Sequence, residues 1–452
     1  MISETFTISS TVTFIKNEQK VYNWINGEYI EFNNDKHPFL NIIINQTKRF
    51  SKFQYEESYD DFEWLLEKKF IVENIDVIKE IIKNDIVKRN ALNELTLILL
   101  PADNACNLDC VYCYEDHSLK KYMGNEENKR LLQFIKNKNV DKVTIEWFGG
   151  EPMLNKNFIL KLCSDIKNIA NIEFISSMTT NAYLLDIDTF KNFIDVNLNS
   201  FQITLDGLED DHNKLRPLSN SKEGSYKLIL DNLINISLLP NSFKFKIMIR
   251  VNFNNNSATK SKRTEVLAKF YKLFGDDERF SYIFRPIGDY ASSNNKKVEN
   301  EVLCLHDSQH SIQKLYEEES ILLGLNIAEL GMYFGNGSAV CYAGKRNHFV
   351  IDSNMKVKKC TVALDDPINM VGSIENNGNF IENKNYILWI QDDLYRNINC
   401  SSCFFISQCQ SNNCKLKTIK NFMPTCPSEI IVNEEQISNQ LIEYIQKYEE
   451  NR

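Results

Sequence analysis

The hydrophobic and polar positions change their period repeatedly through the middle of the chain. Short apolar runs of strand length alternate there with longer stretches in which apolar residues recur every three or four positions. The strand-like runs are 94–100, 142–148, 172–178, 200–205, 245–253 and 280–287, and the helix-like stretches are 126–138, 156–170, 186–196, 224–237 and 261–274. Repeated strand–helix steps predict an α/β fold with a parallel sheet and right-handed crossovers. Six such strands favour a partial (β/α)6 barrel, whose reactive centre should lie at the carboxyl ends of the strands.

The first ninety residues follow a different pattern. Residues 7–33 alternate apolar and polar positions around an "NGE" turn at 26–28, which predicts a β-hairpin or a small meander. Residues 37–48 and 58–73 have apolar positions at helical spacing. Strands followed by helices over this length predict a small α+β, winged-helix-like domain at residues 1–90.

Composition and charge narrow the class of protein. The 452 residues are 43% hydrophobic and 25% charged, which is ordinary for a globular chain long enough for two or three domains. The net charge of −9 argues against a nucleic-acid partner, because such a partner requires a basic face. No apolar run approaches the roughly 18 residues of a membrane-spanning helix, and the N-terminal stretch "MISETFTISS" lacks the pattern of a signal peptide. We therefore expect a cytoplasmic protein with no membrane partner.

Ten of the twelve cysteines fall in two clusters. In the stretch "CNLDCVYCYE", Cys106, Cys110 and Cys113 follow the first predicted strand at spacings of x3 and x2. Seven more lie in the C-terminal quarter of the chain: Cys341, Cys360, Cys400, Cys403, Cys409, Cys414 and Cys426. In a cytosolic protein, thiolates at such spacings are typical of zinc or iron–sulfur sites rather than of disulfides.

The first cluster stops at three cysteines, and this distinguishes two kinds of site. A structural zinc site needs four ligands, so His117 would have to complete a Cys3His set. A 4Fe–4S cube held by only three cysteines leaves one iron free to bind a small molecule. Outside the clusters, Cys163 lies on the apolar face of a predicted helix, and we expect it to be a buried core thiol.

Polar residues stand at the carboxyl ends of the next predicted strands. The second strand ends in "FGGEP" (148–152), whose two glycines permit a tight turn and a close approach of the backbone to a ligand. The third ends in "TTNAY" (179–183), and the fourth continues as "TLDGLEDDHNKLRP" (204–217). These strand ends predict a site for a polar ligand beside the three clustered cysteines.

These residues together resemble the radical S-adenosylmethionine (SAM) enzymes. The shared features are the Cys-x3-Cys-x2-Cys triplet, with Tyr112 before its last cysteine, and the Gly-Gly-Glu-Pro of residues 149–152. The resemblance covers residues 94–290 and implies a 4Fe–4S cluster whose open iron binds SAM, with a 5′-deoxyadenosyl radical formed on reduction. The residues it implies are Cys106, Cys110 and Cys113 on the cluster, and Tyr112, Gly149, Gly150, Glu151, Pro152, Thr180, Asn181, Thr204 and Arg216 around SAM.

The resemblance assigns these contacts to different parts of SAM. The backbone of residues 149–151 would hold the amino group, and Tyr112 would pack by the adenine. Thr204 and Arg216 would grip the carboxylate, for which a guanidinium fork is well shaped. Residues 180–181 would reach the ribose or the methionine end. No general base stands out in the sequence, so we assign no catalytic side chain.

The seven C-terminal cysteines resemble the SPASM domain, which carries two auxiliary 4Fe–4S clusters. The resemblance places Cys400, Cys403, Cys409 and Cys426 on one cluster and Cys341, Cys360 and Cys414 on the other. The eighth ligand would be Cys304, a substrate thiolate or none. Two features depart from the family pattern. Four residues separate Cys409 from Cys414 where the family usually has three, and Asn354 stands near the position where a turn glycine is expected.

The implied chain has five parts. They are a leader-recognition (PqqD-like) domain at 1–90, a radical SAM core at 94–290, a bridging region at 291–340, a SPASM domain at 341–430 and a C-terminal helix at 431–452. The first part would capture a peptide by adding it as a strand to an exposed sheet edge. The alternative is an N-terminal extension that only packs on the barrel.

The resemblance implies an enzyme that abstracts a hydrogen from a ribosomally made precursor peptide and installs a thioether or carbon–carbon cross-link. Its partners would be the precursor with its leader and a flavodoxin- or ferredoxin-type reductant. One alternative is an anaerobic sulfatase maturase forming formylglycine, although that enzyme usually has an Asp where this chain has Thr361. A second is a cross-linking enzyme for a quinone-cofactor precursor. A non-enzymatic alternative is an iron–sulfur electron carrier or a peptide-binding module with structural zinc, which would not cleave SAM.

Overall fold

The chain divides into two structural units, which we call the barrel unit and the N/C unit. The barrel unit consists of residues 92–329 and 347–387, and the N/C unit combines residues 1–91, 330–346 and 388–452. The computed structural model describes residues 5–15, 19–32, 37–44, 50–51, 59–74, 76–90, 92–117, 121–221, 223–288, 303–304, 309–328, 337–392, 394, 400, 403–424 and 426. Among these residues, no helix has the length and apolar character that crossing a membrane requires.

Six parallel strands form the main sheet of the barrel unit. They follow one another in the sheet in their chain order: β7 (Glu94–Leu99), β8 (Lys142–Trp147), β9 (Glu173–Thr180), β10 (Leu198–Thr204), β11 (Lys246–Phe253) and β12 (Phe280–Pro286). Each strand falls on one of the six predicted runs. Val143, Ile145 and Trp147 of β8 are fully buried on the face that the helices cover, where Trp147 packs against Phe158, and this accounts for the alternating sequence pattern. The predicted α/β fold with a six-stranded parallel sheet is confirmed.

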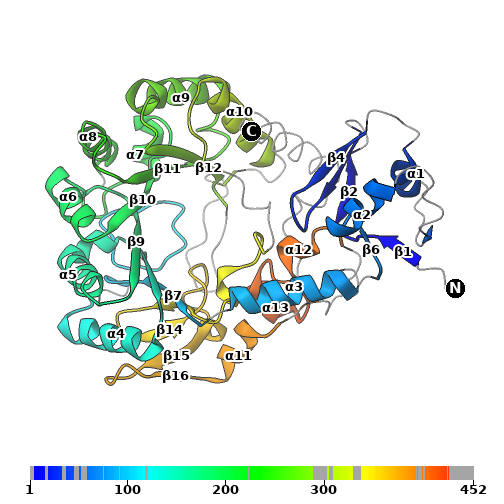
Figure 1. Cartoon of the computed structure of the whole chain (residues 1–452). Coiled ribbons are helices and arrows are strands. Elements are labelled where there is room, and N and C mark those ends of the chain that lie inside the picture. Colours follow the sequence, from blue (N-terminus) through cyan, green and yellow to red (C-terminus); the bar gives the residue numbers. More distant parts are fainter. Residues whose placement is uncertain are drawn as a thin grey trace. The chain divides into compact units, whose positions relative to one another are not determined.

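Helices cover the outer face of this sheet (Figure 1). They are α4 (Asn125–Lys138), α5 (Lys156–Lys167), α6 (Ile187–Asp195), α7 (Glu209–Leu215), α8 (Tyr226–Ser237), α9 (Lys260–Phe274) and α10 (Gln309–Leu322). Five of them match the predicted helical stretches. The other two, α7 and α10, were not predicted. On α5 the apolar face is buried and Cys163 is fully inaccessible, so the prediction of a core thiol is confirmed.

A second set of strands continues the sheet beyond β7. The strand β13 (His348–Ile351) pairs with β7 in parallel, and β14 (Lys356–Lys358), β15 (Met370–Ile374) and β16 (Phe380–Glu382) follow in antiparallel order. The result is one sheet of ten strands. Residues 347–387, predicted as part of the SPASM domain, therefore belong to the barrel unit, whereas residues 388–430 belong to the N/C unit.

The N-terminal part of the N/C unit contains the predicted meander. The strands β2 (Val12–Ile15), β3 (Lys20–Asn23) and β4 (Tyr29–Glu31) pair in antiparallel order. The β3–β4 turn contains Gly27 at a left-handed φ of +76°, which the Asn-Gly sequence accommodates. A second sheet has the order β5 (Phe50–Ser51), β1 (Thr5–Ile8) and β6 (Ile71–Val72).

Three helices accompany these strands: α1 (Pro38–Ile44), α2 (Tyr59–Glu67) and α3 (Asp76–Arg89). The first two lie within predicted helical stretches, but α2 ends before β6, and α3 was not predicted. One hydrophobic cluster joins the strands to α1 and α2 and includes Phe6, Phe39 and Phe62. This is a small α+β arrangement, as the sequence predicted.

The C-terminal part contributes short elements. These are the 3-10 helix η6 (Tyr342–Gly344), α11 (Lys384–Ile390) at the boundary of the two units, α12 (Ile406–Cys409) and α13 (Lys415–Asn421). The predicted C-terminal helix at 431–452 lies outside the described residues, as does most of the bridging region before α10. The five domain boundaries stay predictions.

Candidate functional site

The three clustered cysteines lie in the loop that follows β7, at the carboxyl end of the strand. The pKa of Cys106 is raised mainly by burial and by Glu151. Cys110 and Cys113 lie near enough to add smaller contributions. Burial also raises the pKa of Cys113 to about 12 and that of Cys110 above its ordinary value. Burial therefore favours the protonated form of all three thiols in this loop, and the nearby charge of Arg216 opposes it at Cys110 and Cys113.

Gly149 and Gly150 bring the turn after β8 against the backbone of the cysteine loop. The N–H groups of Gly150 and Glu151 donate to the carbonyls of Asp103 (3.1 Å) and Ala105 (2.8 Å). Gly149 has a left-handed φ of +106°, and a Cβ there would lie 2.4 Å from the Asp103 oxygen. A Cβ on Gly150 would lie 2.4 Å from the Ala105 oxygen. Both positions therefore require glycine, and the reason is close packing of two backbone segments.

We expect Gly150→Ala to displace the cysteine loop. The added Cβ meets backbone atoms rather than a flexible side chain, so the change should destabilise the fold by about 1–3 kcal/mol, as overpacking does. It should also reduce the iron content of anaerobically purified protein. Thermal unfolding and iron analysis measure both effects. Gly124→Ala is the matched control, since a Cβ there meets only the Glu127 carboxylate at 3.6 Å. Equal iron content in the two variants would contradict the role of Gly150.

Glu151 fixes the turn after β8 to the end of β9. Its carboxylate is buried and accepts hydrogen bonds from Met153 N (2.9 Å), Thr180 Oγ1 (2.7 Å) and Asn181 N (2.7 Å). Burial raises the pKa of this carboxyl, and the three donors oppose the shift. Pro152 begins the 3-10 helix η3 (Pro152–Asn155) directly after it. The hydroxyl of Thr180 is therefore engaged with Glu151, which makes it a positioning group.

Asn181 links the end of β9 to the cysteine loop. Its amide donates to Asn107 Oδ1 (2.8 Å), and its nitrogen lies 3.9 Å from Cys106 Sγ. The next residue, Ala182, is fully buried with a left-handed φ of +60°. Asn232 of α8 stabilises this turn by donating to the backbone oxygens of Ala182 (2.9 Å) and Tyr183 (3.4 Å). The turn that carries Asn181 is thus held from behind by α8.

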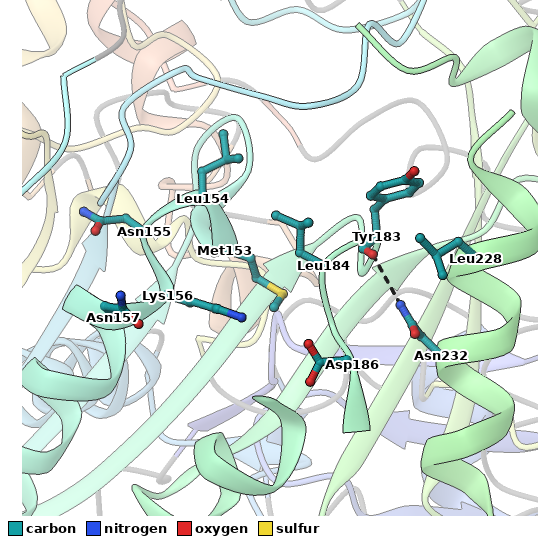
Figure 2. A pocket seen from close by; sticks show the side chains of 10 residues that line it. All are labelled: Met153, Leu154, Asn155, Lys156, Asn157, Tyr183, Leu184, Asp186, Leu228 and Asn232. Atoms are coloured by element: carbon teal, nitrogen blue, oxygen red, sulfur yellow. Dashed lines mark hydrogen bonds between the residues drawn. The ribbon is translucent and has the colours of Figure 1, made fainter. Parts of the chain in front are cut away.

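A pocket of about 510 Å³ lies on the other side of this turn. Figure 2 shows Asn232 pointing from α8 toward the backbone of Tyr183, with Leu184 next to Tyr183 and Met153 farther from α8. None of the candidate cofactor-binding residues lines this pocket. The pocket therefore lies behind the turn that carries Asn181 and is not lined by the residues predicted to bind SAM.

Tyr112 takes part in a buried polar network that the sequence analysis did not predict. Its hydroxyl donates to Asp206 Oδ2 and accepts from Asn252 Nδ2 (3.1 Å), while Asp206 Oδ1 accepts from the Asn252 backbone N–H (2.7 Å). Burial raises the pKa of Asp206, and burial together with Asp206 raises that of Tyr112, which keeps the phenol protonated as the donor. Asp206 thus ties the cysteine loop to the ends of β10 and β11.

Arg216, which follows α7, lies beside the cysteine loop. Its Nη1 donates to the backbone oxygen of Thr204 at the end of β10, and its charge opposes the rise that burial causes in the pKa of Cys110. Burial alone would lower the pKa of Arg216, but the acidic groups around it, Asp206 among them, raise it overall, so the group stays charged. Its Nε is buried and has no hydrogen-bond partner among the described residues. A buried, charged and partly unsatisfied guanidinium is the arrangement that an anionic ligand would complete.

His212 and Ser225 orient the segment that carries Arg216. His212 is fully buried, and its Nδ1 accepts from the Asp206 backbone N–H (3.0 Å). Its Nε2 lies 3.0 Å from Ser225 Oγ, which donates to the Arg216 backbone oxygen (2.8 Å). Burial lowers the pKa of His212 well below its ordinary value, so the imidazole is neutral. The Asp206–His212–Ser225 chain therefore connects the tyrosine network to Arg216.

Asp103 links the cysteine loop to the extra hairpin β13–β14. Its carboxylate accepts from the Ser353 backbone N–H (2.8 Å) and from the Ser353 hydroxyl, and all these groups are buried. In the same hairpin turn, the left-handed residue is Met355, with φ of +61°, and not Asn354. Asn354 instead donates its N–H to Asp352 Oδ1 (3.0 Å). The left-handed residue of this turn, for which the family pattern has a glycine near position 354, is therefore Met355.

The residues around the loop fit a cluster held by three cysteines that also binds a small anionic ligand, because Arg216 is buried and charged beside them. No three His, Cys, Asp or Glu side chains in the described part of the chain converge closely enough to hold one metal ion. His117 Nδ1 lies 2.6 Å from the Asn104 backbone oxygen. A four-iron cube needs no such convergence, since each of its irons takes its own ligand. Besides Arg216 Nε, two more buried polar atoms beside the loop lack a partner within the described residues: Asn107 Nδ2 and Glu115 Oε2.

The C-terminal cysteines divide between the two units. Four of the six cysteines in the N/C unit influence one another electrostatically. Burial is the main cause of the raised pKa of Cys403, and Cys400 and Cys426 add to it. Burial, with contributions from Cys400 and Cys403, raises the pKa of Cys409 to about 12. This is the set predicted to share one auxiliary cluster. Cys341 donates its backbone N–H to Asn412 (2.8 Å), in the loop between Cys409 and Cys414.

Cys360 and Cys304 lie in the barrel unit. The backbone N–H and carbonyl of Cys360 both bond the side chain of the buried Asn369, at 2.9 and 2.8 Å. Cys304 is buried and donates its N–H to Ile287, directly after β12. The three-cysteine cluster of Cys341, Cys360 and Cys414, and the role of Cys304 in it, stay predictions.

Comparison with known proteins identifies the domain at this site. Residues 102–240 match the radical SAM superfamily. A cysteine-type anaerobic sulfatase-maturating enzyme of Clostridium novyi is 28% identical over 366 residues, which cover 73% of this chain and 90% of the relative. The radical SAM cyclopropyl synthase TigE of Paramaledivibacter caminithermalis is 24% identical over 268 residues, covering 50% of this chain and 57% of the relative.

The fold agrees with this match. A solved structure described as native anSMEcpe with bound AdoMet and Cp18Cys peptide superposes with a TM-score of 0.58 at 19% identity, covering 78% of this chain and 99% of that one. The chain therefore has the radical SAM fold, and the cysteine loop at residues 106–113 lies inside the matched domain.

Proposed function

We propose that this chain, a radical SAM enzyme related to the sulfatase maturases, modifies a ribosomally made precursor peptide. The reaction would remove a hydrogen atom from a peptide residue and end in a thioether or carbon–carbon cross-link. The observation that carries the proposal is the set of buried polar groups at the strand ends: the three thiols, the turn anchored by Glu151, and Arg216 with its unsatisfied Nε. An electron carrier would have no use for such a ligand cradle.

The proposed roles of the residues follow from their contacts. Cys106, Cys110 and Cys113 would hold a 4Fe–4S cluster, and bound SAM would supply the 5′-deoxyadenosyl radical that abstracts the hydrogen. Arg216 would direct its free Nε–H to the SAM carboxylate, with its Nη1 remaining on the Thr204 oxygen. These groups would position SAM before reduction.

The surrounding residues would keep this arrangement rigid. Gly149 and Gly150 let the SAM-binding turn pack on the cysteine loop, and Glu151 locks that turn to Thr180 and Asn181. Tyr112 would present its ring edge beside the cofactor while its hydroxyl stays on Asp206. Preorganisation of this kind places the reacting atoms without further rearrangement.

The auxiliary cysteines would hold two further clusters. Cys400, Cys403, Cys409 and Cys426 would hold one, and Cys341, Cys360 and Cys414 the other, with Cys304, a substrate thiolate or no protein group as its last ligand. These clusters would take the second electron of the oxidation or bind the substrate. A flavodoxin- or ferredoxin-type protein would supply the first electron.

Residues 1–90 would recognise the leader of the peptide. The meander β2–β3–β4 supports this role, because β2 and β4 are its two edge strands and an extended peptide adds to such an edge by main-chain hydrogen bonds. The peptide in the anSMEcpe structure is a property of that protein and lends the substrate class to this chain only by analogy. Resemblance to a PqqD-like element rests on the sequence alone.

Formylglycine formation is the second candidate function. The 28% identity to the Clostridium novyi enzyme over 90% of its length favours it. The chain has Thr361 after Cys360, where maturases usually have an aspartate, and it carries α3 and the meander in addition. These two differences favour the cross-linking reaction.

The products distinguish the two reactions. The reconstituted enzyme would be incubated without oxygen with SAM, a reductant and the precursor peptide encoded beside its gene. We expect 5′-deoxyadenosine and a peptide that has lost two hydrogen atoms, as a cross-link requires. Formylglycine formation from cysteine also removes two hydrogen atoms, but it replaces the sulfur by an oxygen from water and releases hydrogen sulfide, so the two products differ in mass and in sulfur content. An unchanged precursor, together with conversion of a sulfatase-derived cysteine peptide, would overturn the cross-linking proposal.

A further inference from the structure

The N-terminal strands and the last cysteine cluster share their hydrophobic cores. One cluster of buried residues contains Tyr22 and Trp24 together with Phe405 and Cys409, and Cys403 packs against it. Another joins Ile25, Val72, Ile78 and Ile82 to Ile406, with Cys400 and Cys403 packed against it. Both cores therefore consist of residues from the two ends of the chain, inside one unit.

Trp24 is the centre of the first core. It lies just after β3 and is only 2% exposed. Its ring lies 5.4 Å from Phe405 and 5.8 Å from Phe404 between centroids, and its Nε1 donates to Thr13 Oγ1 (2.9 Å). Its backbone oxygen accepts from the side chain of Gln408. The indole thus covers the turn between Cys403 and Cys409.

The helix α3 holds the other end of that turn. Gln410, directly after Cys409, has a left-handed φ of +50° and is buried. Its Nε2 donates to Asp85 Oδ2 (2.6 Å), and its Oε1 accepts from Arg89. Asp85 and Arg89 form an ion pair at 3.8 Å within α3. A strained residue beside a cluster cysteine is therefore fixed by side chains of the N-terminal region.

We infer that residues 5–90 form one wall of the site of Cys400, Cys403, Cys409 and Cys426, in addition to any role in peptide recognition. The inference rests on the proposed function only for the identity of the bound group, a 4Fe–4S cluster. Trp24 excludes water from that site, and α3 holds the backbone of residues 409–410. Solvent exposure and ligand placement are what tune such a cluster. The N-terminal domain and the cluster segment accordingly form one cooperative unit.

Substitution of Trp24 tests the wall directly. In full-length protein purified without oxygen, Trp24→Ala should lower the iron content from about twelve to about eight per chain, because one cube of four is lost. In any fraction of the protein that retains this cube, its absorption should bleach several-fold faster in air than in the wild type. Trp64→Ala is the matched control, since Trp64 lies on α2 of the same domain, is 38% exposed and stacks on Phe70. Full iron and unchanged bleaching in Trp24→Ala would overturn the inference.

Hydrogen exchange supplies a second test that does not depend on the folding of the Trp24 variant. In Cys403→Ala, the amides of β2, β3 and α3 should lose protection together with those of residues 406–412. In Cys113→Ala they should keep it. Retained protection of the N-terminal amides in Cys403→Ala would show two independent units and overturn the inference. Neither test uses peptide or SAM turnover, so a failure of the chain to modify a peptide would leave these outcomes unchanged.

Discussion

Replacement of Cys113 by alanine should abolish the formation of 5′-deoxyadenosine from SAM. Cys113 is one of three neighbouring thiols in the loop after β7, and a cube with only two protein ligands would not persist there. Iron should fall by about four atoms per chain, which is the content of one cube. The measurements are iron analysis and chromatographic detection of 5′-deoxyadenosine after reduction with dithionite.

Cys163→Ala is the matched control for this experiment. Cys163 is fully buried on α5, where its Sγ lies 3.8 Å from Ser176 Oγ, so it packs in the core and does not face the loop. Its variant should keep its iron and its SAM cleavage. Continued production of 5′-deoxyadenosine by Cys113→Ala would disprove the assignment of the cysteine loop.

Arg216→Ala should weaken SAM binding roughly tenfold to a hundredfold, which corresponds to the loss of a hydrogen bond to a charged group. The guanidinium is buried and charged, and its Nε has no partner among the described residues, so it is positioned for a carboxylate. Arg216→Lys should recover only part of the affinity, because an ammonium lacks the planar fork. Equilibrium binding of SAM to reconstituted protein measures the effect.

Lys214→Ala provides the comparison, since Lys214 is an exposed cation near the end of α7, two residues before Arg216. It should bind SAM normally. Iron content and thermal unfolding of the Arg216 variants must match those of the wild type for the binding result to be interpreted. A SAM affinity unchanged in Arg216→Ala would disprove its role at the carboxylate.

The sequence predicted the barrel strands well because their patterns are local. Each buried strand such as β8 alternates inward residues with outward ones, and each long helix such as α5 has an apolar face. The helix α7 was missed because its first turn is acidic and only His212 and Leu215 are buried. Likewise α3 is largely charged, with only Ile78 and Ile82 buried, so its periodicity is weak.

Long-range pairings could not be predicted in this way. The parallel pairing of β13 with β7 depends on a register between residues about 250 positions apart, as does the bond of Asp103 to Ser353. Nothing in the local sequence of either partner indicates the other. Likewise, nothing near Tyr112 in the sequence indicates that Asn252 of β11 donates a hydrogen bond to its hydroxyl.

The residues predicted for the site lie around the cysteine loop, and their roles stay predictions; many of their contacts could not be predicted. The cysteines, the Gly-Gly-Glu-Pro turn and Arg216 were found by motif. The motif did not indicate that Thr180 is engaged with Glu151, or that the glycines are needed for backbone packing on residues 103–105. Asp206 stood in the quoted "TLDG" stretch, two positions after Thr204, and its buried network becomes evident only when β10 and β11 are placed side by side.

The bond between Gln408 and Trp24 joins residues 384 positions apart, and this has a consequence for synthesis on the ribosome. At about 5–20 residues per second, roughly 20–80 s separate the appearance of the two partners. During that interval the N-terminal strands can complete the core around Phe6 and Phe39, but the surface around Trp24 stays uncovered. A nascent chain with an exposed indole is a target for chaperones. The cluster proposed for Cys400, Cys403, Cys409 and Cys426 would therefore form only after both partners of this bond have been synthesised.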